Sequence, residues 1–196
     1  MTEARVERRL AAILAADVAG YSRLMGVNEE GTPATLKAHR RELLDPKIAE
    51  HRGRIVKTTG DGALVEFASA VDAVRCAAEI QRGMSKRNVA IPPDRRIEFR
   101  MGINVGDVVV DGDDIFGDGV NVAARLEGLS EPGGICVSGR VQEDAQGKID
   151  IAFDDAGERT EQQYPNRGMV IPGHGSIAGD ATVQTLALLA KQSVKP

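Results

Sequence analysis

The alternation of apolar residues with polar or small ones between positions 97 and 105 constrains the fold of this chain more than any other feature. Every second position there is apolar: Ile97, Phe99, Met101, Ile103 and Val105. A period of two places these side chains on one face of a β-strand, and that face needs a covering layer. The pattern predicts a long strand in a half-buried sheet, which residues 108–110 continue.

Patterns on both sides of this strand predict a regular order of strands and helices. Short apolar runs rich in strand formers indicate strands, and apolar positions at helical spacing indicate helices. The expected strands are 9–17, 54–59, 63–67 and 135–137, and the expected helices are 22–51 with a break at 31–33, 71–80, 119–129 and a last one that ends near 145. The order βαββαβ predicts an α+β fold, a ferredoxin-like sandwich.

Regular patterning stops after residue 157. Proline and glycine punctuate the segment that follows, and only residues 183–189 show a weak helical stripe. We therefore predict one globular domain over residues 1–157 and a tail over residues 158–196 to which no fold is assigned.

Composition excludes several classes of protein. Lys and Arg total 25 against 29 Asp and Glu, and a formal charge of -4 argues against a nucleic-acid partner. The longest apolar run, residues 10–16, is far shorter than the roughly 20 residues of a membrane span, and no signal-peptide pattern opens the chain. We expect a cytoplasmic protein in which Cys76 and Cys136, which form no CxxC motif, are packing residues.

Two aspartates stand at the ends of neighbouring predicted strands. Asp17 closes the first strand, and Asp61 lies between two glycines at the tip of the predicted hairpin. Two carboxylates so placed suit hard divalent cations that also contact phosphates. A helix cap at Asp17 and a turn residue at Asp61 are the alternatives, and the residues alone leave both interpretations open.

The residues after Asp17 lead from a strand into a helix. Their backbone N–H groups can face a triphosphate at the positive end of the helix dipole. Further along, Asn121 and Arg125 are four residues apart, which places an amide and a guanidinium on one helical face where both can reach the same oxygen atoms. A solvated helix face is the alternative for this pair.

Four segments, in this order and spacing, resemble the motifs of class III nucleotidyl cyclases. They read LAADVAGYS, KTTGDGALVEF, DIFGDGVNVAARL and EPGGICVS, and the resemblance extends over about residues 9 to 154. It implies the palm-like fold of that family over the predicted domain. It also implies that Asp17 and Asp61 bind two metal ions, Mg²⁺ or Mn²⁺, in each active site, and that the backbone of Val18, Ala19, Gly20 and Tyr21 holds phosphates.

The resemblance further implies roles for four side chains that recognise the nucleotide. Lys57 and Asp114 would select the base, because an ammonium donates to a ring nitrogen of adenine and a carboxylate accepts from its exocyclic amine. Asp113 is the neighbouring alternative to Asp114. Asn121 would orient the ribose, and Arg125 would stabilise the phosphate in the transition state.

The function implied is that of an adenylate cyclase, which converts ATP to 3′,5′-cyclic AMP and pyrophosphate. Members of the family form head-to-tail dimers in which one subunit supplies the metal aspartates and the other supplies the base-selecting and transition-state residues. This chain carries both sets, so the resemblance implies a homodimer with two complete sites.

The resemblance ends near residue 159. The family's triphosphate-binding lysine has no counterpart, since no lysine occurs between Lys148 and Lys191, and Arg159 or Arg167 would have to replace it. Three alternatives therefore stay open: a catalytically poor cyclase-like module that binds nucleotide or dimerises, a guanylate cyclase, and another two-metal enzyme on a similar sheet such as a diguanylate cyclase.

Overall fold

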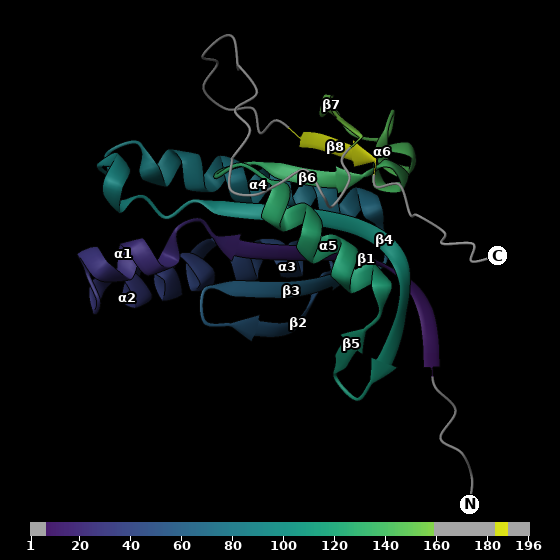
Figure 1. Cartoon of the computed structure of the whole chain (residues 1–196), viewed down its shortest axis with the longest axis horizontal. Helices are drawn as coiled ribbons and strands as arrows, with labels where there is room; N and C mark the ends of the chain where they lie inside the picture. The colour runs from purple at the N-terminus through teal and green to yellow at the C-terminus, as the bar shows by residue number, and fades with distance from the viewer. Residues whose placement is uncertain (1–6, 159–182, 188–196) are drawn as a thin grey trace, which may run out of the picture.

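The structure is a computed structural model that describes residues 7–158 and 183–187 (Figure 1). Its strands are β1 (Glu7–Val18), β2 (Arg54–Thr59), β3 (Gly62–Phe67), β4 (Phe99–Asp111), β5 (Asp114–Phe116), β6 (Ile135–Ser138), β7 (Phe153–Glu158) and β8 (Val183–Ala187). Its helices are α1 (Tyr21–Val27), α2 (Gly31–His39), the π-helix η1 (Arg40–Leu44), α3 (Asp45–Glu50), α4 (Ala70–Asn88), the 3₁₀-helix η2 (Pro93–Arg95), α5 (Asp118–Leu129) and α6 (Gly139–Ala145).

One mixed sheet joins all the described strands. Its order is β2-β3-β1-β4-β6-β8-β7, and β5 pairs with β4 as a hairpin. The strands β2, β3, β1 and β4 pair in antiparallel fashion, whereas β6 runs parallel to β4 and β8 runs parallel to both β6 and β7. The first four strands and their helices have the ferredoxin-like arrangement, and the predicted α+β fold with βαββαβ order is confirmed.

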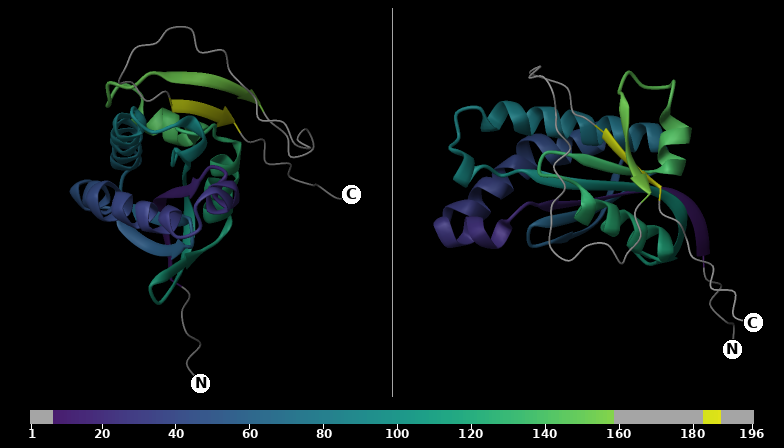
Figure 2. Two further views of the ribbon diagram at one scale, coloured as in Figure 1. Left: turned by 90° about the vertical axis from the view of Figure 1, so that its left-hand side faces the viewer. Right: turned by 45° about the horizontal axis from the view of Figure 1, so that its top comes forward.

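The two faces of the sheet carry separate cores because side chains alternate along β1. Ala12, Leu14 and Ala16 pack with residues of α2, α3, α4 and α6, whereas Ala11 and Ile13 face α5. Figure 2 shows β7 and β8 on the side of the molecule away from β2 and β3. The first face is covered by several helices and the second, among the described elements, by α5 alone.

Glycines let α5 approach β4 closely. A Cβ atom added to Gly102 of β4 would overlap the backbone of Ala123 and Glu127 in α5. A Cβ on Gly106 would lie 3.0 Å from the Cα atom of Gly119. The side chains of α5 are therefore held at a fixed, short distance from the sheet.

The tail contains a strand where the sequence suggested a helical stripe. Val183–Ala187 form β8, which lies between β6 and β7. The stripe over residues 183–189 is therefore a wrong prediction for these five residues, because pairing with the backbones of two neighbouring strands outweighs a weak local periodicity. The remainder of residues 159–196 lies outside the described residues, and the division at residue 157 stays a prediction.

Two smaller expectations concern the described part of the chain. Cys76 and Cys136 are buried in the hydrophobic clusters of the domain, which confirms them as packing residues. None of the helices described is both long enough and apolar enough to cross a membrane.

Candidate active site

Asp17 and Asp61 come together at one end of the sheet. The pairing of β1 with β3 brings Ala16 opposite Ala63, so the turn that carries Asp61 lies beside the last residues of β1. Gly62 permits this approach, because a Cβ there would lie 2.9 Å from the carbonyl oxygen of Ala16. Burial, and then the hydrogen bond and the negative charge of Asp17, raise the pKa of Asp61 above its usual value.

Two charged residues that the sequence analysis did not single out complete this end. The Arg100 Nη2 atom of β4 lies 2.8 Å from Oδ2 of Asp17 and 3.2 Å from Oε1 of Glu127 in α5. Burial raises the pKa of Glu127 to about 7, with Arg100 opposing the shift and Asp17 and Asp61 adding to it. In the sequence, Arg100 stands out as a charged residue between the apolar Phe99 and Met101. Its partners, however, depend on how α5 lies on the sheet and could not be read from that position.

The carboxylates at this end fit a hard divalent cation. Two of them, Asp17 and Asp61, are in contact, and burial, followed by the hydrogen bond and the charge of Asp17, raises the pKa of Asp61. Asp17, Asp61 and Glu127 bring three carboxyl groups to this end, where Arg100 contacts Asp17 and Glu127. Oxygen ligands with surplus charge are what Mg²⁺ and Mn²⁺ prefer.

A second acidic cluster in the described part of the chain already contains a paired cation. Glu50, His51 and Glu79 lie near enough to one another to share an ion. The ammonium of Lys47 lies 2.7 Å from a carboxylate oxygen of each glutamate and pairs with both. This cluster is an ion-pair network on the helical side of the molecule.

The segment after Asp17 forms the start of α1. Gly20 has φ of 64°, in the left-handed region, and precedes the first helical residue, Tyr21. The N–H of Ala19 donates to the carbonyl of Glu98 at 2.8 Å, so it belongs to the sheet, and Val18 is buried in β1. The candidate phosphate donors nearest the solvent are therefore the backbone groups of Gly20 and Tyr21.

Basic side chains lie near Gly60, in the β2–β3 turn that carries Asp61. A cavity of about 460 Å³ adjoins Gly60 and is lined by Tyr21, Lys37, Arg40 and Arg41 among others. These cations of α2 and η1 thus line a cavity with Gly60, the residue that precedes Asp61.

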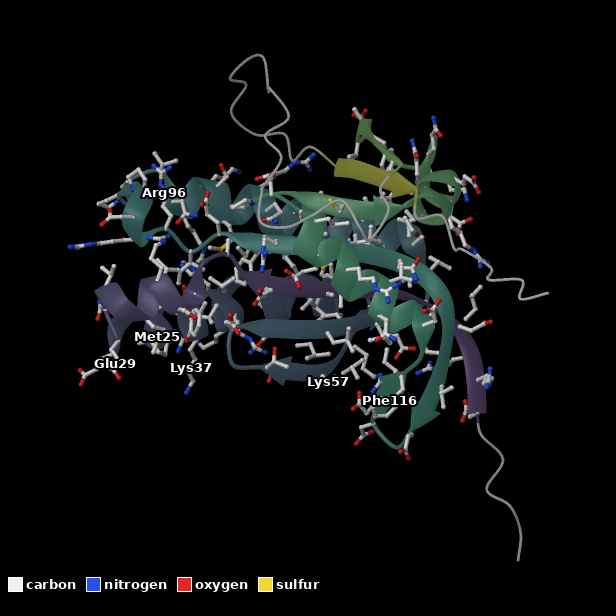
Figure 3. The ribbon with its side chains drawn as sticks, in the orientation of Figure 1. Met25, Glu29, Lys37, Lys57, Arg96 and Phe116 are labelled. Carbon is white, nitrogen blue, oxygen red and sulfur yellow. The ribbon has the colours of Figure 1, made fainter. Side chains whose placement is uncertain are left out.

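Lys57 and Asp114 meet at the hairpin of β4 and β5. The Lys57 Nζ atom lies 3.1 Å from each carboxylate oxygen of Asp114 and 5.2 Å from the centroid of the Phe116 ring. Figure 3 shows Lys57 and Phe116 at the same edge of the molecule. The hydrogen bonds from Lys57 lower the pKa of Asp114. Lys57 contacts Asp114, whereas Asp113 offers its carbonyl oxygen to Arg54.

Asn121 and Arg125 lie on the exposed side of α5. Both side chains are exposed, and the buried positions of the same helix, Ala123 and Leu126, face the sheet. The two residues thus lie four positions apart on the exposed side of one helix, and their roles stay predictions.

The residues fall into two groups within one chain. In the strand register, Asp17 of β1 lies opposite Arg100 near the beginning of β4. Asp114 of β5 lies opposite Asp111 at the end of β4. Figure 1 shows α1, which follows Asp17, and β5 at opposite ends of the sheet. Within the described part of one chain, Asp114 therefore lies at the opposite end of β4 from Asp17, whereas Lys57 lies on β2, four residues before Asp61.

Comparison with known proteins identifies the family. Residues 7–163 match the model of the adenylate and guanylate cyclase catalytic domain. The chain is 52% identical over 157 residues to a Rhizobium meliloti protein named "Putative adenylate cyclase 3", and the match covers 80% of this chain and 27% of that protein. It is 32% identical over 135 residues to an adenylate cyclase of Streptomyces coelicolor, covering 69% of this chain and 34% of the relative. This chain thus spans about a quarter to a third of these two relatives.

Solved structures give the same family. A crystal structure titled adenylate/guanylate cyclase/hydrolase from Silicibacter pomeroyi is 53% identical, has a TM-score of 0.76, and is matched over 94% of its chain and 82% of this one. The adenylyl cyclase CyaB from P. aeruginosa is 26% identical with a TM-score of 0.62, over 82% of its chain and 71% of this one. The chain belongs to the family of adenylate and guanylate cyclase catalytic domains.

Proposed function

We propose that this domain is an adenylate cyclase that converts ATP to 3′,5′-cyclic AMP and pyrophosphate. The observation that carries the choice of ATP is the contact of Lys57 with Asp114, each carboxylate oxygen 3.1 Å from the ammonium. An ammonium next to a carboxylate presents a donor and an acceptor in the order that adenine requires, and guanine presents the opposite groups. The names of two relatives support the same choice.

Asp17 and Asp61 would hold the divalent cations, two in each active site. When bound, Mg²⁺ or Mn²⁺ would neutralise phosphate charge and favour deprotonation of the ribose 3′-hydroxyl. Burial and then Asp17 raise the pKa of Asp61, and a bound cation would offset this shift by favouring the charged carboxylate. Arg100 now pairs with the Asp17 carboxylate, so it would either share that carboxylate with a cation or move away from it.

The remaining residues would bind and orient the nucleotide. The backbone N–H groups of Gly20 and Tyr21 would donate to phosphate oxygens, and Asn121 would hold the ribose. The 3′-oxygen would then attack the α-phosphorus as the bond to pyrophosphate breaks, and Arg125 would compensate the negative charge that grows on the phosphate oxygens.

We place each active site between two copies of the chain in a head-to-tail homodimer. The proposal is supported by the position of Asp114, which lies at the end of β4 opposite to the one that faces Asp17. A two-fold axis that brings the end of one sheet to the opposite end of the other would create two complete sites.

A turnover assay across protein concentration tests the proposal. Purified protein with Mn²⁺ or Mg²⁺ should release cyclic AMP and pyrophosphate from ATP, and specific activity should rise with concentration as dimers form. Preferential turnover of GTP would instead identify a guanylate cyclase. Nucleotide binding without any turnover would identify the catalytically poor module.

A further inference from the structure

A buried carboxylate on β3 organises two arginines beside the base-selecting pair. The side chain of Glu66 is 7% exposed, and Arg9 and Arg54 approach it at 2.8 Å and 2.7 Å. A carboxylate buried to this degree needs fully charged and well-oriented donors, since an unpaired buried charge is costly. Glu66 therefore fixes the orientation of the Arg54 guanidinium.

The same guanidinium reaches the tip of the β4–β5 hairpin. Arg54 donates Nε and Nη2 to one oxygen of Glu66, at 3.2 and 2.7 Å, and donates Nη1 to the carbonyl oxygen of Asp113 at 2.8 Å. The planar fork of arginine serves two acceptors in different directions, which the ammonium of lysine cannot do with the same geometry. Arg54 thus connects the core of the sheet to a turn that its own strand does not pair with.

The turn bound by Arg54 is the one that carries Asp114. Asp113 precedes Asp114 directly, and the turn from Asp111 to Asp114 contains Gly112 in a left-handed conformation, with φ of 59°. After it, β5 has only three residues, of which Ile115 is fully buried. Lys57, three residues after Arg54 on β2, contacts the Asp114 carboxylate from the same strand.

We propose that Arg54, oriented by Glu66, is a positioning residue that sets the distance between Lys57 and Asp114 and thereby the discrimination between adenine and guanine. This inference rests on the proposed role of Lys57 and Asp114 in base selection. Arg54 itself need not contact the nucleotide: it holds the hairpin, and the hairpin holds Asp114.

The test compares Arg54→Gln and Arg54→Lys with Arg75→Gln. Arg75 is a matched control because it is an exposed arginine on α4 that also donates to a distant backbone carbonyl, that of Lys148, at 2.9 Å. Arg54 is 41% exposed, so both variants at this position should fold. Two readouts are needed: amide hydrogen exchange of residues 108–117, and the ratio of kcat/KM for ATP to kcat/KM for GTP.

Both Arg54 variants should raise hydrogen exchange in the hairpin by about tenfold and lower the ATP-to-GTP ratio several-fold, while Arg75→Gln changes neither. Arg54→Lys should keep the wild-type melting temperature, because an ammonium still neutralises Glu66, yet it should fail to restore the ratio. A purely structural role would instead let Arg54→Lys restore both readouts, and that outcome overturns the proposal.

Unchanged exchange in Arg54→Gln, or faster exchange with an unchanged ratio, would also overturn it. If the wild-type protein turns over neither nucleotide, the proposed function fails on its own. The exchange comparison then still decides whether Arg54 fixes the hairpin, because it requires no activity.

Discussion

The two ends of the sheet differ in how their aspartates are paired. At the end of β1, Asp17 and Asp61 are in contact, and the pKa of Asp61 is raised. At the β4–β5 hairpin, Asp114 is paired with Lys57, and its pKa is lowered. The first end holds more negative charge than its own residues compensate, and the second is compensated within the chain.

This difference separates two ways in which a site can be prepared for a ligand. The aspartate end gains stability when a cation arrives, because repulsion between carboxylates is relieved. The hairpin end must give up an ion pair to receive a base, so its selectivity depends on how well the two charges are positioned. Each of the following changes tests one side of this comparison.

Replacement of Asp61 by Asn should have the largest effect, because it removes a proposed cation ligand. We expect cyclase activity to fall by roughly 100-fold or more, while the metal-free protein melts at a slightly higher temperature since one of the two repelling charges is gone. Activity assays and thermal unfolding with and without Mn²⁺ measure both effects. Asp94→Asn, in the exposed helix η2, is the control, and retained activity in Asp61→Asn would refute the metal role.

Replacement of Gly102 by Val should destabilise the protein, because the new side chain displaces α5 from β4. The new side chain would overlap the backbone of Ala123 and Glu127, and such overpacking costs about 1–3 kcal/mol. Chemical denaturation measures the loss. Gly128→Ala on the same helix has open space at its Cβ and should be neutral or stabilising. Equal stability of the two variants would show that α5 tolerates a shift.

The raised pKa of Glu127 predicts that the stability contributed by the aspartate end depends on pH. Its pKa rises from 4.5 to about 7 on folding, so the folded state binds the proton more tightly. Its contribution to stability is complete below pH 4.5 and is lost as the pH rises through 7. The free energy of unfolding of the wild type relative to Glu127→Gln should therefore fall by at most about 3 kcal/mol across this window. A pH-independent difference would contradict the shift.

Replacement of Lys57 by Met should have the smallest effect on stability, because exposed ion pairs contribute little. The expected change in melting temperature is close to zero, but the ATP-to-GTP ratio of kcat/KM should fall by about tenfold. Kinetics with both nucleotides measure this. Lys86→Met, on the exposed surface of α4, is the control, and an unchanged ratio in Lys57→Met would remove Lys57 from base selection.

Local patterns predicted most of the fold because they are strong and short in range. The alternation over residues 97–105 predicted a strand, and the glycine-flanked Asp61 predicted a hairpin turn, and both are present as β4 and the β2–β3 connection. The weak stripe over residues 183–189 misled, since β8 is held by two neighbouring strands rather than by its own periodicity.

The sequence by itself determined the α+β fold and the residue types of both ends, because strand period, turn glycines and ordered motifs are written in local sequence. Only the tertiary structure decided how Asp17 meets Asp61, how Arg100 lies between Asp17 and Glu127, and how Glu66 directs Arg54 to the hairpin. These contacts join residues between 12 and 83 positions apart, and they depend on strand register and on the approach of α5. No local pattern carries that information.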